Sequence, residues 1–192
     1  HYITANLAHR LLRIDVVTKA VKDLTPGYDR LFTNSGEFSF DIAPDGKAVV
    51  AATTVIPELA GSLAKSDLDA MKKEAKRRKD SKMTAQVTEH RQYRYWDHAL
   101  TDNLAHRLLL INVETKELTD LTPKWDRLFS SSGEATFDVA PDGKQVAVAI
   151  NSVEPPYRER PNSDIYLIST DGSGVLKNLT ADNRATDDGP RF

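Results

Sequence analysis

Residues 38–52 read Phe-Ser-Phe-Asp-Ile-Ala-Pro-Asp-Gly-Lys-Ala-Val-Val-Ala-Ala, and this stretch decides the fold class. Phe38–Ile42 and Ala48–Ala52 are short runs of apolar and aromatic residues, which is typical of β-strands. Pro44-Asp45-Gly46 lies between them. Proline fixes φ at the second position of a turn, and glycine accepts the positive φ that closes it. The stretch therefore predicts a β-hairpin.

The hairpin belongs to a long internal repeat. A shift of 97 positions superimposes Ile3–Val55 on Leu100–Ser152, and 32 of these 53 positions are identical. The turn recurs as Pro141-Asp142-Gly143, and Asp23-Leu24-Thr25-Pro26 recurs as Asp120-Leu121-Thr122-Pro123. Chance does not produce such identity over this length, so the sequence contains a duplication. An internal repeat of this kind points to a modular architecture.

A second type of hairpin occurs three times. Arg10–Thr25, Arg107–Thr122 and Ile165–Thr180 each read as strand, polar turn and strand, followed by Leu-Thr. The third copy has the turn Thr170-Asp171-Gly172-Ser173-Gly174, which carries the residues that hairpin turns require.

Alternation of the two hairpin types predicts four-stranded antiparallel units. One unit starts at Glu37, is interrupted after Val55 and finishes with Arg107–Thr122. Another starts at Glu134 and finishes with Ile165–Thr180. The uninterrupted unit spans about 45 residues, the length of one blade of a β-propeller.

The expected fold is all-β: a β-propeller fragment of four-stranded antiparallel blades with a helical insertion. Arg10–Thr25 would be the back half of an earlier blade, and Asp188–Phe192 would open the next. A β-sandwich or barrel is the competing interpretation, but the repeat length and paired hairpins favour blades. The chain divides into propeller residues 1–55, an insertion over 56–91, and propeller residues 92–192.

The insertion has the pattern of a basic helix. Ser66 is expected to cap it, with Asp67 and Asp69 in the first turn, where the helix dipole favours negative charge. Residues 72–79, Lys-Lys-Glu-Ala-Lys-Arg-Arg-Lys, are strongly basic. A solvated surface helix is the favoured interpretation, and a patch that binds an anion or a partner is the alternative. A thin apolar stripe at helical spacing would face the blades: Ala64, Leu68, Met71 and Ala75.

An aromatic cluster, Tyr93-Arg94-Tyr95-Trp96-Asp97, follows the insertion. Packing of the insertion back onto the blade is the favoured role of this cluster, and a ligand-binding wall is the alternative.

Composition excludes several classes of function. The 192 residues are 40% hydrophobic and 28% charged, a globular balance, and the net charge of −2 gives no general attraction to nucleic acid. Cysteine is absent, so there is no disulfide or thiol nucleophile. No apolar run approaches the roughly 20 residues of a membrane span. This composition suits the cytoplasm or the periplasm and does not choose between them.

A search for catalytic motifs identifies none. The sequence has no Gly-x-Ser-x-Gly elbow, no Gly-rich phosphate loop and no His-Glu-x-x-His zinc motif. Asp45 and Asp142 suggest calcium-binding or catalytic carboxylates, but their hairpin context favours a structural role in which they accept backbone N–H groups of their turns. The five histidines are His1, His9, His90, His98 and His106. His9 and His106 occupy one repeat position and are expected to be structural. His90 and His98 flank the aromatic cluster beside Glu89 and Asp97, and a metal site there is the less favoured alternative, because spacing alone does not bring ligands together. The sequence thus predicts no catalytic, cofactor-binding or metal-binding residue in this chain.

Two motif groups carry a family resemblance. Ala-Pro-Asp-Gly-Lys at 43–47 and 140–144 resembles the Ser-Pro-Asp-Gly-Lys signature of TolB-like propellers. Thr88–Asp97, followed by a strand and Asp120–Pro123, resembles the N-terminal propeller of bacterial prolyl oligopeptidase-family serine peptidases, of the acylaminoacyl-peptidase and dipeptidyl-peptidase kind. The resemblance covers Lys65–Phe192. Three stretches fit the following blade: Asn162–Leu167, Asn178–Thr180 and Asp188–Phe192.

The resemblance implies a non-catalytic propeller that gates peptide access to a C-terminal α/β-hydrolase domain carrying a Ser-Asp-His triad, which these 192 residues do not contain. The paired glutamates with which dipeptidyl peptidases hold a substrate N-terminus are not found here. Alternatives are a stand-alone TolB-like protein-binding module and an engineered or duplicated fragment without its own activity. Two blades and two halves do not close a ring of four to eight blades. We therefore expect an oligomer or further blades.

Overall fold

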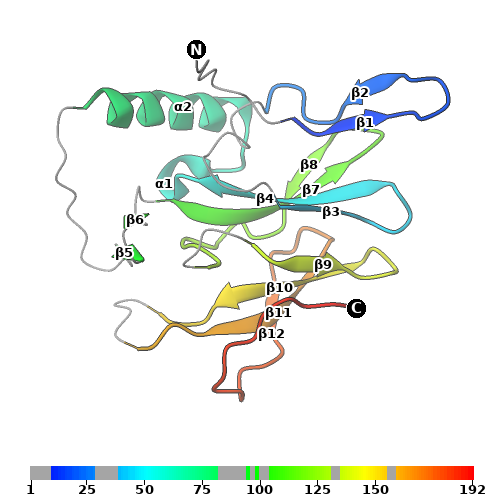
Figure 1. The fold of residues 1–192 in the computed structure, drawn as a ribbon. Helices are drawn as coiled ribbons and strands as arrows, with labels where there is room; N and C mark the ends of the chain where they lie inside the picture. The colour runs from blue at the N-terminus through cyan, green and yellow to red at the C-terminus, as the bar shows by residue number, and fades with distance from the viewer. Residues whose placement is uncertain are drawn as a thin grey trace, which may run out of the picture.

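The structure is a computed structural model that describes residues 10–28, 39–81, 104–130, 135–154 and 159–192, together with the backbone of 94–95 and 98–99. The described part is mostly β-structure in antiparallel sheets, with two helices. Figure 1 shows the N-terminal hairpin, then one four-stranded sheet, then the other, in chain order. The helices lie on the same side of the first four-stranded sheet as the N-terminal hairpin.

Two four-stranded sheets form the body. Sheet I has the order β3 (Phe40–Ile42), β4 (Ala48–Val55), β7 (Ala105–Asn112) and β8 (Leu118–Asp120). Sheet II consists, in order, of β9 (Phe137–Val139), β10 (Gln145–Asn151), β11 (Ser163–Ser169) and β12 (Leu176–Asn178). The four-stranded units expected from the repeat are therefore confirmed.

Two smaller pairs complete the described sheet structure. The N-terminal hairpin pairs β1 (Leu12–Ile14) with β2 (Val21–Asp23), and a short pair joins β5 (Arg94–Tyr95) to β6 (His98–Ala99). Sheets I and II both have two open edges, so the described residues do not form the closed barrel considered as a rival fold.

Sheet I is continuous across the insertion. β4 and β7 pair in register over eight residues, from Ala48 opposite Asn112 to Val55 opposite Ala105. The chain therefore leaves the sheet after Val55 and returns beside the same point. The pairing matches the interrupted unit predicted from the duplication.

Both Pro-Asp-Gly turns have the chemistry read from the sequence. The N–H groups of Gly46 and Gly143 donate to the carbonyls three residues earlier, at 2.7 and 2.8 Å, and both glycines have positive φ, 66° and 69°. The carboxylates of Asp45 and Asp142 each accept the N–H two residues later, at 2.9 Å. The two aspartates are thus structural turn residues.

The Leu-Thr sequence at the end of each second hairpin has a common hydrogen bond. The hydroxyls of Thr25, Thr122 and Thr180 accept backbone N–H groups of Leu11, Leu108 and Ile165 at 3.2, 3.0 and 3.0 Å. Since this bond closes the strand pair beyond its last ladder bond, it explains why Thr occurs at this position in all three copies.

The described part of the insertion is helical, as predicted, but the start of its main helix differs from the expectation. Helix α2 (Lys65–Asp80) begins one residue before Ser66, so the Ser66 cap was wrong. Asp67 caps the helix instead, because its Oδ2 accepts the N–H groups of Ala64 at 3.1 Å and Ser62 at 3.0 Å. A short helix, α1 (Pro57–Ala60), precedes it with proline in its first turn.

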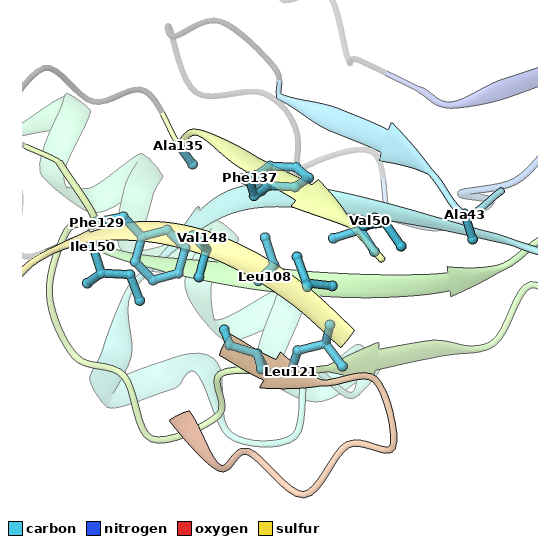
Figure 2. Close-up of a cluster of buried hydrophobic side chains, with 13 residues drawn as sticks. Ala43, Val50, Leu108, Leu121, Phe129, Ala135, Phe137, Val148 and Ile150 are labelled. Atoms are coloured by element: carbon cyan, nitrogen blue, oxygen red, sulfur yellow. The ribbon is translucent and has the colours of Figure 1, made fainter. Parts of the chain in front are cut away.

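Two apolar clusters hold the elements together. One lies between sheets I and II and includes Val50, Leu108 and Leu121 from sheet I together with Phe137 and Val148 from sheet II (Figure 2). The other covers the opposite face of sheet I and joins it to the N-terminal hairpin and both helices. Its members are Leu11, Leu24, Val49, Ala51, Val55, Ala60, Leu63, Leu109, Ile111 and Val113, with Tyr28, Leu68, Met71 and Leu118 at the margin.

One hydrogen bond links the first strand of each unit to the next unit, and it occurs twice. Asp41 in β3 accepts the N–H of Val139 in β9 at 3.1 Å. Asp138 in β9, the repeat equivalent of Asp41, accepts the N–H of Phe192 at 2.7 Å. The same contact therefore connects sheet I to sheet II and sheet II to the segment that follows it.

Candidate functional site

The two ends of the four-stranded sheets differ. At one end, tight turns join β3 to β4, β7 to β8, β9 to β10 and β11 to β12. The other end, called here the long-connection end, carries the longer segments 56–104, 121–136 and 152–162. Binding residues concentrate on the long connections of rigid scaffolds. This end is therefore the candidate functional site.

An aromatic and cationic cluster lies where connection 121–136 meets sheet II. The guanidinium carbon of Arg127 is 4.6 Å from the ring centroid of Trp125, a cation–π distance. Tyr166 in β11 meets Trp125 edge-on, with ring centroids 6.3 Å apart. Arg127 Nη2 also donates to Glu154 Oε1 at 3.4 Å. The cluster thus links a connection of sheet I to the adjacent sheet.

Two donors of this cluster are shielded from solvent. Within the described ranges, Trp125 Nε1 and Arg127 Nε have no hydrogen-bond partner. Burial without a partner costs about 1–3 kcal/mol per group. Because neither atom is accessible, a ligand reaches them only if the surrounding chain moves. The buried part of the cluster serves packing between the sheets, while Glu154 at its rim is largely exposed.

A buried ion pair supports the start of β7. Arg107 Nε lies 3.2 Å from Asp120 Oδ2, without the alignment of a hydrogen bond, and Arg107 Nη2 donates to the Pro123 carbonyl at 3.1 Å. Burial raises the pKa of Asp120 and lowers that of Arg107, while their mutual attraction opposes both shifts. Arg107 thus contacts β8 through Asp120 and holds the start of connection 121–136 against β7 through the Pro123 carbonyl.

Of the five histidines, His106 is the one whose side chain the structure describes. It is buried, and its Nδ1 accepts the N–H of Phe129 at 2.7 Å, so the ring proton is on Nε2. The two rings stack with centroids 5.1 Å apart. His106 therefore has the structural role predicted for the repeated histidine. His1, His9 and His90 lie outside the described residues, and His98 is described only as backbone in β6.

Metal-binding geometry is not found in the part of the chain that the structure describes. No group of three or more His, Asp or Glu side chains there is placed to hold an ion. Asp45 and Asp142, the carboxylates that suggest calcium in the sequence, are occupied by the turn N–H groups given above.

Helix α2 has two unlike sides. Leu68 and Met71 pack against the apolar cluster that joins sheet I to the N-terminal hairpin and the helices, whereas Ala64 and Ala75, expected in the same stripe, are exposed. The basic residues of the helix are exposed, apart from the half-buried Arg78. Arg77 and Arg78 both bind Glu74, at 2.7 and 2.9 Å. These bonds lower the pKa of Glu74 to about 2. The solvated helix and the anion-binding patch both remain predictions, and the aromatic side chains of 93–97 lie outside the described residues.

Comparison with known proteins leaves the family unassigned. No family model and no curated protein sequence matches this chain.

No helix in the described ranges is long and apolar enough to cross a bilayer.

Sequence reasoning missed the residues that support the connections at the long-connection end. Arg107 and Asp120 could have been found, because Arg10 and Asp23 repeat the same pair 97 residues earlier. An aromatic residue followed by Asp-Arg also recurs, at Tyr28 and at Trp125. The shared spacing was a usable signal for both contacts.

Proposed function

We propose that this chain is the propeller portion of a serine peptidase of the prolyl oligopeptidase family. Its blades would restrict which peptides reach a hydrolase domain, and its own residues would cut no bond. In this proposal sheets I and II are two complete blades, and the N-terminal hairpin is the outer half of a third.

The observation that carries the proposal is the repeated link between first strands. Asp41 bonds to Val139, and its equivalent Asp138 bonds to Phe192. If the same contact joins each unit to the next, each unit is related to its neighbour by the same rotation and translation. Twisted four-stranded sheets repeated in this way would be arranged radially around an axis. Aligned sandwich sheets need no such serial link between their first strands.

The chain order of the strands supports the same fold. Sheet II is built from four consecutive strands, and sheet I has the same order, interrupted between β4 and β7 by the helices and the β5–β6 pair. The first strand of each sheet is the one that meets its neighbour through the Asp bond, which is the arrangement of inner strands around a central axis. The peptidase assignment itself rests on the sequence motifs at 88–97, 120–123 and 188–192.

The proposed mechanism is steric and electrostatic. The long-connection end would face the peptide path, where connections 121–136 and 152–162 limit the size of what enters. Glu154 is exposed there, and its ion-pair partner is Arg127, 3.4 Å away. A positively charged peptide side chain would compete with Arg127 for the exposed Glu154 carboxylate, whereas a negatively charged one would be repelled by it.

The first test is the reading frame beyond Phe192, which should encode an α/β-hydrolase domain with a Gly-x-Ser-x-Gly nucleophile. A frame that continues into an unrelated domain, or stops, would overturn the peptidase proposal and favour the stand-alone binding module. The purified 192-residue chain should neither hydrolyse fluorogenic peptides nor react with a fluorophosphonate probe. Hydrolysis abolished by that probe would refute the division of labour.

The gating mechanism has its own test in the full enzyme. Glu154→Lys should lower kcat/KM for peptides carrying lysine severalfold relative to peptides carrying glutamate. Glu117→Lys makes the same charge change at the opposite, tight-turn end, where Glu117 is exposed, and should leave this ratio unchanged. Equal responses of the two variants would show that the long-connection end does not select substrates by charge.

A further inference from the structure

Helix α2 carries a row of lysines along its length. At about 100° per residue, four of them fall within an arc of about 60° and span about 21 Å of the helix axis. This lysine row consists of Lys65, Lys72, Lys76 and Lys79, with Lys73 beside it, and all five are exposed. The helix has seven Lys or Arg and four Asp or Glu, a net charge of +3, so the rest of the chain carries −5 of the total of −2. Positive charge is thus concentrated on α2.

The stability of the helix does not account for the lysine row. Lys72 and Lys76 are four residues apart, and Lys76 and Lys79 are three apart, which are spacings at which like charges repel each other. The helix dipole favours positive charge only within the last turn, so it explains Lys79 but not Lys65 or Lys72. The row therefore lowers helix stability unless an anion from outside the helix balances it.

The described part of the chain does not supply that anion. No lysine of α2 forms an ion pair there, and the Glu74 carboxylate is already bound by Arg77 and Arg78. Lysine is almost never fully buried without a paired charge, so we do not expect further units of the same protein to cover the row. Leu68 and Met71 hold the helix on the apolar cluster of sheet I, which gives the row a fixed direction.

Three features favour a short acidic polypeptide over a nucleic acid or a membrane as the partner of the row. Helix α2 has no aromatic residue, whereas proteins that bind single-stranded nucleic acid stack its bases on aromatic side chains. Leu68 and Met71 pack inward, so the helix has no free apolar side to enter a bilayer. The negative charge of the rest of the chain would repel a long polyanion or an anionic membrane surface, but a short segment meets the helix alone.

We propose that the lysine row of α2 binds an extended acidic segment of a partner protein. At about 3.3 Å per residue, a segment of about six or seven residues matches the length of the row. Carboxylates on alternate residues recur about every 6.6 Å on one side of the segment, close to the rise of about 6 Å from Lys72 to Lys76. Asp69 lies beside the row and repels an unbroken run of carboxylates, so alternating acidic and neutral residues fit best. This interaction goes beyond peptide gating and does not depend on it.

Fluorescence anisotropy with the purified 192-residue chain and a labelled peptide, Glu-Ser-Glu-Ser-Glu-Ser-Glu, tests the binding. It should be saturable, weaken as salt is added, and disappear when glutamine replaces every glutamate of the peptide. Lys72→Glu combined with Lys76→Glu should raise Kd about tenfold, because two attractions become repulsions. The matched control, Lys144→Glu combined with Lys177→Glu, makes the same charge change at two exposed lysines of the sheet II hairpins. It should change Kd by less than about twofold, because charges far from the row are screened.

A peptide of reversed charge shows that the row variant is folded and that pairing of opposite charges causes the binding. The variant with Lys72→Glu and Lys76→Glu should bind Lys-Ser-Lys-Ser-Lys-Ser-Lys more tightly than the wild type does, and its far-UV circular dichroism should match that of the wild type. Absence of saturable binding of the acidic peptide to the wild type would overturn the proposal. Equal weakening in the control variant would also overturn it, as would tighter binding of oligo(dT) or of phosphatidylserine vesicles than of the acidic peptide.

Discussion

Replacement of Thr122 by valine removes one hydroxyl from the repeated hydrogen bond and keeps the shape of the side chain. Thr122 Oγ1 accepts the N–H of Leu108 at 3.0 Å, and both residues are fully buried. The variant leaves a buried N–H without a partner, which costs about 1–3 kcal/mol. The methyl group that replaces the hydroxyl returns about 0.8 kcal/mol at most. We expect a net loss of about 1–2 kcal/mol in the free energy of unfolding.

The repeat supplies the matched control. Thr180 makes the same bond to Ile165 at 3.0 Å, but both residues are only half-buried, so water can reach the N–H that Thr180→Val releases. Its cost should stay below about 0.5 kcal/mol, because a hydrated donor does not pay the full penalty. Thr122→Ser keeps the hydroxyl and should lose only the methyl contribution, about 0.8 kcal/mol.

Urea unfolding followed by circular dichroism measures these differences, and equal slopes would confirm that the denatured state is unchanged. The variants should rank Thr122→Val as the least stable, then Thr122→Ser, then Thr180→Val. A Thr122→Val protein as stable as the wild type would refute the role assigned to the Leu-Thr sequence. Equal losses at Thr122 and Thr180 would show that burial does not set the cost.

Three further outcomes are expected. Arg107→Ala should lower the free energy of unfolding by about 3–5 kcal/mol in urea titrations, because it strands a buried carboxylate, whereas Arg10→Ala at the exposed copy of the pair should cost less than about 1 kcal/mol. Lys116 has φ 63°, so Lys116→Gly should be neutral or stabilising by up to about 1 kcal/mol in thermal unfolding, and Lys116→Val should be destabilising. The pKa of Glu74, about 2, should appear in a carboxyl NMR titration and rise toward 4.5 in Arg77→Ala. Because this pKa is lowered on folding, its stabilising contribution is present above pH 4.5 and is lost as the pH falls toward 2.

The hairpins and their grouping into sheets could be predicted because their signals are local. Pro44-Asp45-Gly46 specifies a turn through the φ preferences of its own residues, and the Leu-Thr endings mark where the second hairpins close. The duplication then supplied what local signals lack. It showed that β4 and β7 belong to one unit although the insertion separates them, and their register confirms it.

The start of helix α2 was harder to predict because a cap depends on how the chain arrives. Ser66 had the right residue type, but Leu63 takes a positive φ of 60° and turns the chain so that Ala64 becomes the N-cap. Asp67 then reaches back to the cap N–H. The turn at Leu63 has no signature in the sequence, since leucine is an unusual residue for positive φ. Helix α1 does have one, Pro57 at its start and Gly61 after its end, which the sequence reasoning did not use.

The candidate site shows the limit of reasoning from repeated residues. Arg10 with Asp23 and Arg107 with Asp120 are the same pair in sequence, yet the first is exposed and the second is buried. The difference lies in what packs over each copy, which is a tertiary property. Sequence identity between the repeats could have located the contact, but it gives no information on how much each copy contributes to stability.

The pairing of Val55 with Ala105 also bears on how this chain can vary. Since the departing and returning strands are neighbours at that point, the chain between them is topologically a single connection between two paired strands. Segments of quite different length or composition could be accommodated there without shifting the alignment of the flanking strands, at a closure cost that grows only slowly with length. A replacement segment would keep the strand alignment, but it would also have to supply the apolar cover that Ala60 and Leu63 give to sheet I.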